Sequence, residues 1–250
     1  MRNLFLQLLL WSAMNCVSAE QIQFQSGTNR TVLLELYTSE GCSSCPPAEA
    51  WFSRLKSNAR LWNDFAPVAF HVDYWDYLGW RDPFGAADYS ERQRAYAAQW
   101  KSRSVYTPGF VLDGKEWRGW FNRDDLPSAS NLAVGTLTAS SDDGKRWLLR
   151  FEPTVRNTSS FDFHAVLLGF DLTSDVKAGE NRGHKLQHDF VVLTLAKATS
   201  KRSGDSIQAE LSLIPQSRLS ANRVAVTAWI TRRNDLQPLQ AVGGWLPSNK

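Results

Sequence analysis

Residues 33–47 read LLELYTSEGCSSCPP, and this stretch governs the interpretation of the rest of the chain. Residues 31–37 are apolar and rich in side chains that favour extended backbone, so they predict a β-strand. Pro46 and Pro47 suit the first turn of a helix, where a missing N–H costs little. Residues 48–56 carry large apolar side chains at the spacing of one helix face. The predicted order is therefore strand, short loop, Cys-x-x-Cys pair and helix.

This order has a chemical consequence for Cys42 and Cys45. A cysteine just before a helix meets unpaired N–H groups and the positive end of the helix dipole, and both stabilise a thiolate. Two intervening residues allow the second sulfur to reach back and resolve a mixed disulfide. We assign Cys42 as the attacking thiol and Cys45 as the resolving thiol. An inert structural disulfide remains an alternative, as does half of a zinc site, although no second cysteine pair completes four ligands.

The first segment, residues 1–19, has the layout of a secretory signal peptide. Arg2 supplies a positive start, the apolar run that follows is too short to span a bilayer, and small residues precede a cut after Ala19. A buried N-terminal helix is the alternative. Lipid attachment at Cys16 fits less well, because a polar asparagine precedes it. We expect an exported protein, periplasmic or extracellular, with no stable membrane insertion.

The composition excludes several classes of protein. The chain has 250 residues, of which 43% are hydrophobic and 21% charged, which argues against a disordered, collagen-like or coiled-coil protein. The formal net charge is +3 and no dense lysine–arginine block is present, so no nucleic-acid partner is expected.

A second motif lies downstream of the cysteines. Thr107-Pro108 comes directly before an apolar stretch that predicts a strand. With the cysteine pair, it resembles the thioredoxin superfamily, and more narrowly an exported thioredoxin-like family catalogued as domain of unknown function 1223. The residues that carry the narrower resemblance are ELYTSEGCSSCPPA (35–48), HVDYWDYLGW (71–80), DPF (82–84), RQ (92–93), YTP (106–108) and GENRG (179–183).

The resemblance implies a fold and a redox site, but no assigned reaction. It implies that Pro108 is cis and lies against the cysteines, with Thr107 as its substrate-facing neighbour. The chain departs from thioredoxin at Gly41, where a Trp is usual, and at residues 43–44, where Ser-Ser replaces Gly-Pro. Because the dipeptide between the cysteines helps to set redox poise, the reducing strength of thioredoxin is not implied.

We predict two domains after the signal peptide. The first is an α/β thioredoxin-like domain over residues 20–133, with a helical insert at about 74–104. The second is an all-β sandwich-like C-terminal domain over residues 134–250, since short strands there alternate with turn-forming residues at the spacing of an antiparallel sandwich.

Two sets of side chains are candidates for roles beside the cysteines. Tyr74, Trp75 and Trp80 belong to an aromatic cluster that could line a substrate groove, or simply pack the insert onto the core. Glu35, on the strand that leads to the pair, could accept the proton of Cys45 as a buried carboxylate. Strand alternation does not reveal whether its face meets the helix or solvent, so a non-catalytic role remains open.

Histidines give weaker signals. His184 and His188 have the i, i+4 spacing that seats a metal on a helix, but their segment lacks a helix pattern, so a solvated or hydrogen-bonded pair is the better interpretation. His71 is interpreted as structural. We therefore expect neither a metal site nor an organic cofactor.

The leading hypothesis is an exported thiol–disulfide oxidoreductase whose partners are protein or small-molecule thiols and disulfides. One alternative is a non-catalytic binding protein built on a thioredoxin scaffold. Another is a carrier of copper or another soft metal through the two thiolates.

Overall fold

The structure is a computed structural model that describes residues 21–122, 126, 129–155, 160–203, 206–214, 221 and 223–247. The expected signal peptide at 1–19 lies outside these residues. Within them, no helix is long and apolar enough to cross a membrane. The helices are α1 (Cys45–Ser53), α2 (Ala87–Gln99) and α3 (Gly119–Asn122), with 3-10 turns at Arg54–Ser57 and Asp76–Leu78. The strands are β1 (Ile22–Gln25), β2 (Val32–Thr38), β3 (Phe65–His71), β4 (Gly109–Leu112), β5 (Lys115–Glu116), β6 (Gly135–Ser141), β7 (Arg146–Pro153), β8 (Phe161–Phe170), β9 (Leu172–Asp175), β10 (Lys185–His188), β11 (Val191–Thr199), β12 (Lys201–Ser203), β13 (Ser206–Ser212), β14 (Arg223–Arg232) and β15 (Pro238–Trp245).

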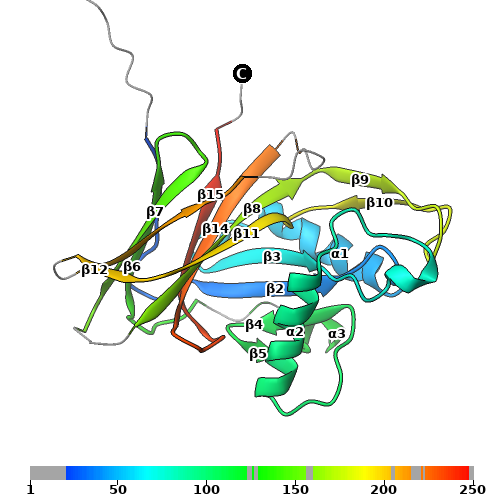
Figure 1. The fold of residues 1–250 in the computed structure, drawn as a ribbon, viewed down its shortest axis with the longest axis horizontal. Helices are drawn as coiled ribbons and strands as arrows, with labels where there is room; N and C mark the ends of the chain where they lie inside the picture. Colours follow the sequence, from blue (N-terminus) through cyan, green and yellow to red (C-terminus); the bar gives the residue numbers. More distant parts are fainter. Residues whose placement is uncertain are drawn as a thin grey trace, which may run out of the picture.

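An eight-stranded sheet runs through the molecule in the order β15-β14-β8-β11-β3-β2-β4-β5 (Figure 1). Strand β3 pairs in parallel with both β2 and β11, and the remaining pairs are antiparallel. A five-stranded sheet of order β1-β6-β7-β13-β12 packs beside it, and β9 and β10 form a separate hairpin.

This architecture corrects the predicted fold class. The prediction of an α/β thioredoxin-like domain with a helical insert, followed by an all-β sandwich-like domain, is wrong. Of the described residues, 46% are in strands and only 16% in helices, and strands from both halves of the chain share the eight-stranded sheet. The reason is visible in β8, which is buried at all 10 of its positions. A strand covered on both faces belongs inside a large, fully covered sheet rather than on the half-exposed face of a sandwich.

Strand β14 shows how the sheet serves two cores. Ala225 and Trp229 pack into a core shared with α1, α2, β2 and β3. Val226, Ala228 and Ile230, on the opposite face, pack into a second core against β6, β7 and β13 of the five-stranded sheet. Because successive side chains of a strand point to opposite faces, one strand contributes to both cores.

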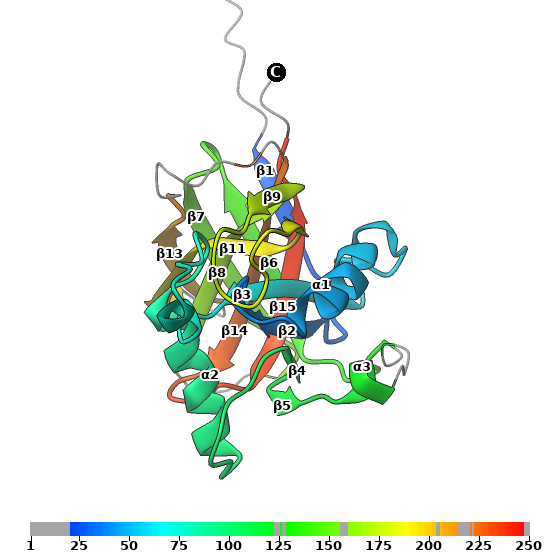
Figure 2. The same ribbon diagram turned by 90° about the vertical axis from the view of Figure 1, so that its right-hand side faces the viewer.

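Helices α1 and α2 lie on opposite faces of the sheet around β2 (Figure 2). Leu36 is opposite Phe110 in the β2–β4 register, and the Phe110 ring lies 6.2 Å from that of Phe52 in α1. Glu35, the next position along β2, faces the other way and forms an ion pair with Arg92 of α2. Because side chains alternate along a strand, Leu36 of β2 lies on the face covered by α1 and Glu35 lies on the face covered by α2.

Strand β15, with the sequence PLQAVGGW, carries two adjacent glycines, which weaken the pattern of a strand. Both glycines are required by close neighbours. A Cβ at Gly243 would lie 2.4 Å from the Trp62 ring, and one at Gly244 would lie 2.2 Å from the Phe24 ring. The glycines thus let two aromatic side chains pack directly on the strand.

Candidate functional site

The cysteine pair sits where the sequence predicts, between β2 and the start of α1. Cys45 is the first residue of α1, and prolines occupy the first turn. The two Sγ atoms lie 2.7 Å apart as free thiols, and both side chains are buried, Cys42 with 1% exposure. Ser44 is the N-cap residue, but its hydroxyl makes no cap bond and lies instead 3.2 Å from the Cys42 sulfur.

These contacts make the two thiols unequal. The hydrogen bond from Cys45, reinforced by Ser44 and Thr107 and opposed by burial, lowers the pKa of Cys42 to about 6. Burial raises the pKa of Cys45, and the hydrogen bond and charge of Cys42 raise it further. Cys42 is therefore ionised at neutral pH while Cys45 holds its proton. That is the division between attacking and resolving thiols.

We expect the alkylation rate of reduced protein by iodoacetamide to rise with a midpoint near pH 6 at Cys42, set by its pKa of about 6. The thiolate is the reacting species, and an ordinary thiol has a pKa of about 8.5. Restricted access of the reagent to the sulfur slows the reaction by the same factor at every pH, so the midpoint still reports the pKa of Cys42. The measurement is the rate against pH, with the labelled residue identified by mass spectrometry. Ser44→Ala removes one stabilising hydrogen bond and should move the midpoint upward. A midpoint above pH 8 would contradict the assignment.

The loop with Thr107 and Pro108 lies against the pair. The peptide bond between them is cis, as the resemblance implied. The Thr107 carbonyl oxygen lies 3.6 Å from the Cys42 sulfur. The indole N–H of Trp75 donates to the Thr107 hydroxyl at 2.8 Å. The loop is therefore fixed beside the Cys42 sulfur.

Tyr74, Trp75 and Trp80 all lie around the cysteine loop and are half-buried. The Tyr74 hydroxyl donates to Gln93 at 3.1 Å, and burial, followed by the charge of Cys45, raises its pKa. The Trp80 indole donates to the Glu40 carboxylate at 2.7 Å. Their polar atoms are thus anchored to the protein.

Trp75 also accounts for the departure from thioredoxin at Gly41. A Cβ on Gly41 would come 2.8 Å from the Cβ of Trp75, closer than two such atoms approach. A large residue before Cys42 would displace Trp75, so glycine at this position and tryptophan at 75 belong together.

Glu35 lies on the face of β2 that meets α2. Its carboxylate accepts hydrogen bonds from the hydroxyls of Tyr37 at 2.9 Å and Tyr96 at 2.6 Å. Arg92 donates to both oxygens, at 2.7 and 3.0 Å. Cys45 begins α1 on the opposite face of the sheet. The contacts of Glu35 therefore describe a buried ion pair, and they give no support to its predicted role as proton acceptor.

Two residues of the β9–β10 loop complete the site. Asn181 donates from its amide to the backbone oxygens of Glu40 and Cys42, both at 2.9 Å. The Glu180 carboxylate accepts the backbone N–H of Ser43 at 2.9 Å. Both belong to the GENRG motif, which the sequence singled out without suggesting a role. Glu180 and Asn181 therefore hold the cysteine loop although they lie far from it in the sequence.

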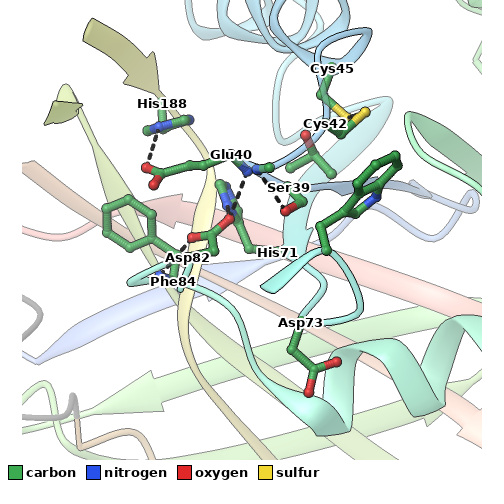
Figure 3. A network of polar contacts seen from close by, with 12 residues as sticks. Ser39, Glu40, Cys42, Cys45, His71, Asp73, Asp82, Phe84 and His188 are labelled. Atoms are coloured by element: carbon green, nitrogen blue, oxygen red, sulfur yellow. Dashed lines mark hydrogen bonds and ion pairs between the residues drawn. The ribbon is translucent and has the colours of Figure 1, made fainter. Parts of the chain in front are cut away.

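A buried polar network lies behind the cysteine loop (Figure 3). His188 contacts Glu40 through Nε2 at 3.0 Å and Glu49 through Nδ1. His71 Nδ1 contacts Asp82 at 2.8 Å. Burial lowers the pKa of His188, but the two glutamates outweigh burial and raise it to about 10. The structural interpretation of His71 and the hydrogen-bonded interpretation of His188 fit these contacts.

The glutamates of this network were missed by sequence reasoning. Glu49 follows Cys45 by one turn of α1 and shares its buried face, a spacing that could have signalled a polar neighbour of the pair. Its carboxylate accepts the Thr38 hydroxyl at 2.5 Å. His184, by contrast, is exposed and takes no part.

Comparison with known proteins gives the family and the fold. A structural-genomics protein of Agrobacterium tumefaciens is 22% identical with a TM-score of 0.59, over 89% of this chain and 96% of that one. HBP35 of Porphyromonas gingivalis is 12% identical with a TM-score of 0.57, over 88% of this chain and 76% of that one. At these identities the likeness concerns the fold alone. No curated protein matches the chain. The match to a family of proteins spans residues 33–229, and the chain therefore belongs to the family described as "Protein of unknown function (DUF1223)".

Proposed function

We propose that the protein is an exported thiol–disulfide oxidoreductase with Cys42 and Cys45 as its catalytic residues. The observation that carries the proposal is the pairing of a Cys42 thiol, whose pKa is lowered to about 6, with a buried, protonated Cys45 at 2.7 Å. A structural disulfide needs no such asymmetry, whereas a nucleophile and its resolving thiol do.

The reaction has two exchange steps. The Cys42 thiolate attacks one sulfur of a protein or small-molecule disulfide, forms a mixed disulfide and releases the other substrate sulfur as a thiolate. Cys45 then gives up its proton and attacks the Cys42 sulfur. This forms the Cys42–Cys45 disulfide and releases the second substrate thiol. The reverse sequence oxidises a dithiol, and no cofactor is needed for either direction.

The finer likeness to the thioredoxin superfamily is proposed for the site and not for the fold. This protein and the thioredoxin superfamily share a cysteine pair at the start of a helix that faces a cis-proline loop. In this proposal Thr107 and Pro108 present backbone groups to an extended substrate. Tyr74, Trp75 and Trp80 border the path by which the substrate reaches Cys42. Their polar atoms are hydrogen-bonded to the protein, which would keep this path rigid.

The reduction potential of the pair, followed against pH, tests this function. With Cys42 at a pKa of about 6, the potential should fall by about 59 mV per pH unit below pH 6 and by about 30 mV per unit above it, since one proton fewer accompanies the two electrons. Equilibration with glutathione or dithiothreitol buffers, read out by thiol trapping, supplies the values.

The same titration separates the alternatives. Reversible two-electron cycling in the folded protein supports the oxidoreductase. A disulfide that resists dithiothreitol until the protein unfolds would instead mark a structural bond. A pair that equilibrates with the buffer but does not accelerate the reduction of an added protein disulfide would mark a binding scaffold.

A further inference from the structure

We propose that Glu49, His71 and His188 form a binding site for one divalent transition-metal ion of the zinc class. One ligand atom from each residue lies within 4.8 Å of the others. The residues come from α1, β3 and β10, and their exposures are 7%, 1% and 1%. Two imidazoles and one carboxylate form a ligand set that binds zinc in proteins and leaves a coordination position open.

The free nitrogen of His71 points to a ligand. Its Nδ1 lies 2.8 Å from Asp82 Oδ2. In the neutral ring with its proton on Nδ1, directed at this carboxylate, Nε2 presents a lone pair. Nε2 is buried and has no hydrogen-bond partner among the residues that the structure describes. Buried polar atoms are almost always paired, and a metal ion would satisfy this one.

His188 is oriented in the same manner. Its Nε2 lies 3.0 Å from Glu40 Oε1, and Glu40 is itself held by the Trp80 indole at 2.7 Å. The other ring nitrogen of His188, Nδ1, contacts the Glu49 carboxylate. The metal would take the place of the proton that His188 and Glu49 share. Each histidine thus has a carboxylate on its far nitrogen, the outer-shell arrangement that fixes the tautomer of metal-binding histidines (Figure 3).

The charge of the cluster also suits a cation. Glu40, Glu49 and Asp82 are all buried, and their ion-pair partners are the two histidines. The Thr38 hydroxyl donates to Glu49 Oε1 at 2.5 Å, which leaves the second oxygen toward the imidazoles. A divalent ion would balance carboxylates that otherwise depend on protonated imidazoles for their positive charge.

The test must exclude metal binding by the thiolates, so it uses the Cys42→Ser/Cys45→Ser double variant of the mature chain with Zn²⁺ alone. We expect one Zn²⁺ per chain in chelator competition. X-ray absorption at the zinc edge should show two imidazole nitrogens at about 2.0–2.1 Å and no sulfur. This spectrum needs no ligand substitution, so it does not depend on how a variant folds. Absence of stoichiometric zinc, or a spectrum without imidazole, would overturn the site.

Substitutions then assign the ligands. Asp82→Asn leaves the three ligands in place and should weaken zinc binding by about 10–100-fold, the usual effect of losing an outer-shell partner. His71→Ala and Glu49→Gln should weaken it more. The exposed His184→Ala is the matched control and should bind as the parent does. Far-ultraviolet circular dichroism without metal establishes which variants are folded. A folded His71→Ala with parental affinity would contradict the assignment.

Discussion

Replacing Cys42 with serine should reduce disulfide exchange to the uncatalysed level, while replacing Cys45 with serine should trap the protein on its substrate. A serine hydroxyl does not ionise near pH 7, so the first variant has no nucleophile. The second retains the Cys42 sulfur and can still attack, but it lacks the thiol that lies 2.7 Å away to complete the reaction. In the proposed reaction Cys42 carries the chemistry in both directions, so its loss should have the largest effect on activity of any single substitution.

The measurement is turnover of a mixed disulfide with glutathione, together with mass spectrometry of non-reduced protein. Cys45→Ser should carry a covalent glutathione adduct at Cys42, and Cys42→Ser should carry none. Ser43→Ala, at an exposed position between the two, is the control and should retain turnover. Parental turnover by Cys42→Ser would refute the proposed function. It would leave the metal proposal standing, because that test is made without either cysteine.

Replacing Arg92 with methionine should lower the free energy of unfolding by about 3–5 kcal/mol, the cost of leaving one partner of a buried ion pair uncompensated. The Glu35 side chain is 0% exposed and that of Arg92 8%. The guanidinium also lies over the rings of Phe70, Tyr96 and Trp229, at 5.1–5.6 Å from their centroids. It therefore connects α2 with β2, β3 and β14.

Equilibrium unfolding in urea gives the loss, and the Glu35→Gln/Arg92→Met double variant gives the coupling. Because the double variant leaves no buried charge behind, it should recover a large part of the lost stability. Its Cys42 alkylation midpoint should stay near the parental value, since Glu35 faces α2 rather than α1. If Arg92→Met lowers the free energy of unfolding by less than about 1 kcal/mol, the Glu35–Arg92 ion pair contributes no more than a solvent-exposed pair does. A shifted midpoint in the double variant would restore a catalytic role to Glu35.

The local part of the site was predictable, because its signals lie within a few residues. Cysteine spacing, the two prolines and the apolar run of β2 predict the strand, loop and helix that the structure shows. The cis bond before Pro108 came from resemblance, since physics alone favours trans. The face of Glu35 was not predictable, because it depends on which side of the sheet α2 covers.

The predicted fold was wrong because strands of its two expected domains pair with each other, β1 with β6 and β3 with β11. Val191 of β11 pairs with Ala69 of β3, and this pairing joins the two halves of the chain in one sheet. A hint existed in residues 161–170, whose sequence FDFHAVLLGF is apolar at most positions, as in a strand covered on both faces rather than a half-exposed sandwich strand. The spacing of the histidines in the sequence also did not reveal their neighbours in the fold. His184 precedes β10 and is exposed, whereas His188 meets His71 and Glu49 from two other elements.

The shared sheet sets the order in which the proposed redox site can form. A chain is synthesised from its N-terminus, so Cys42 and Cys45 are available long before Asn181 and His188, which hold the loop around them. The edge of β3 that β11 covers also stays unpaired until then. Until the later strands are synthesised, the two thiols therefore lack the contacts that make them different. The thiol reactivity of the native protein then indicates that the whole chain has folded.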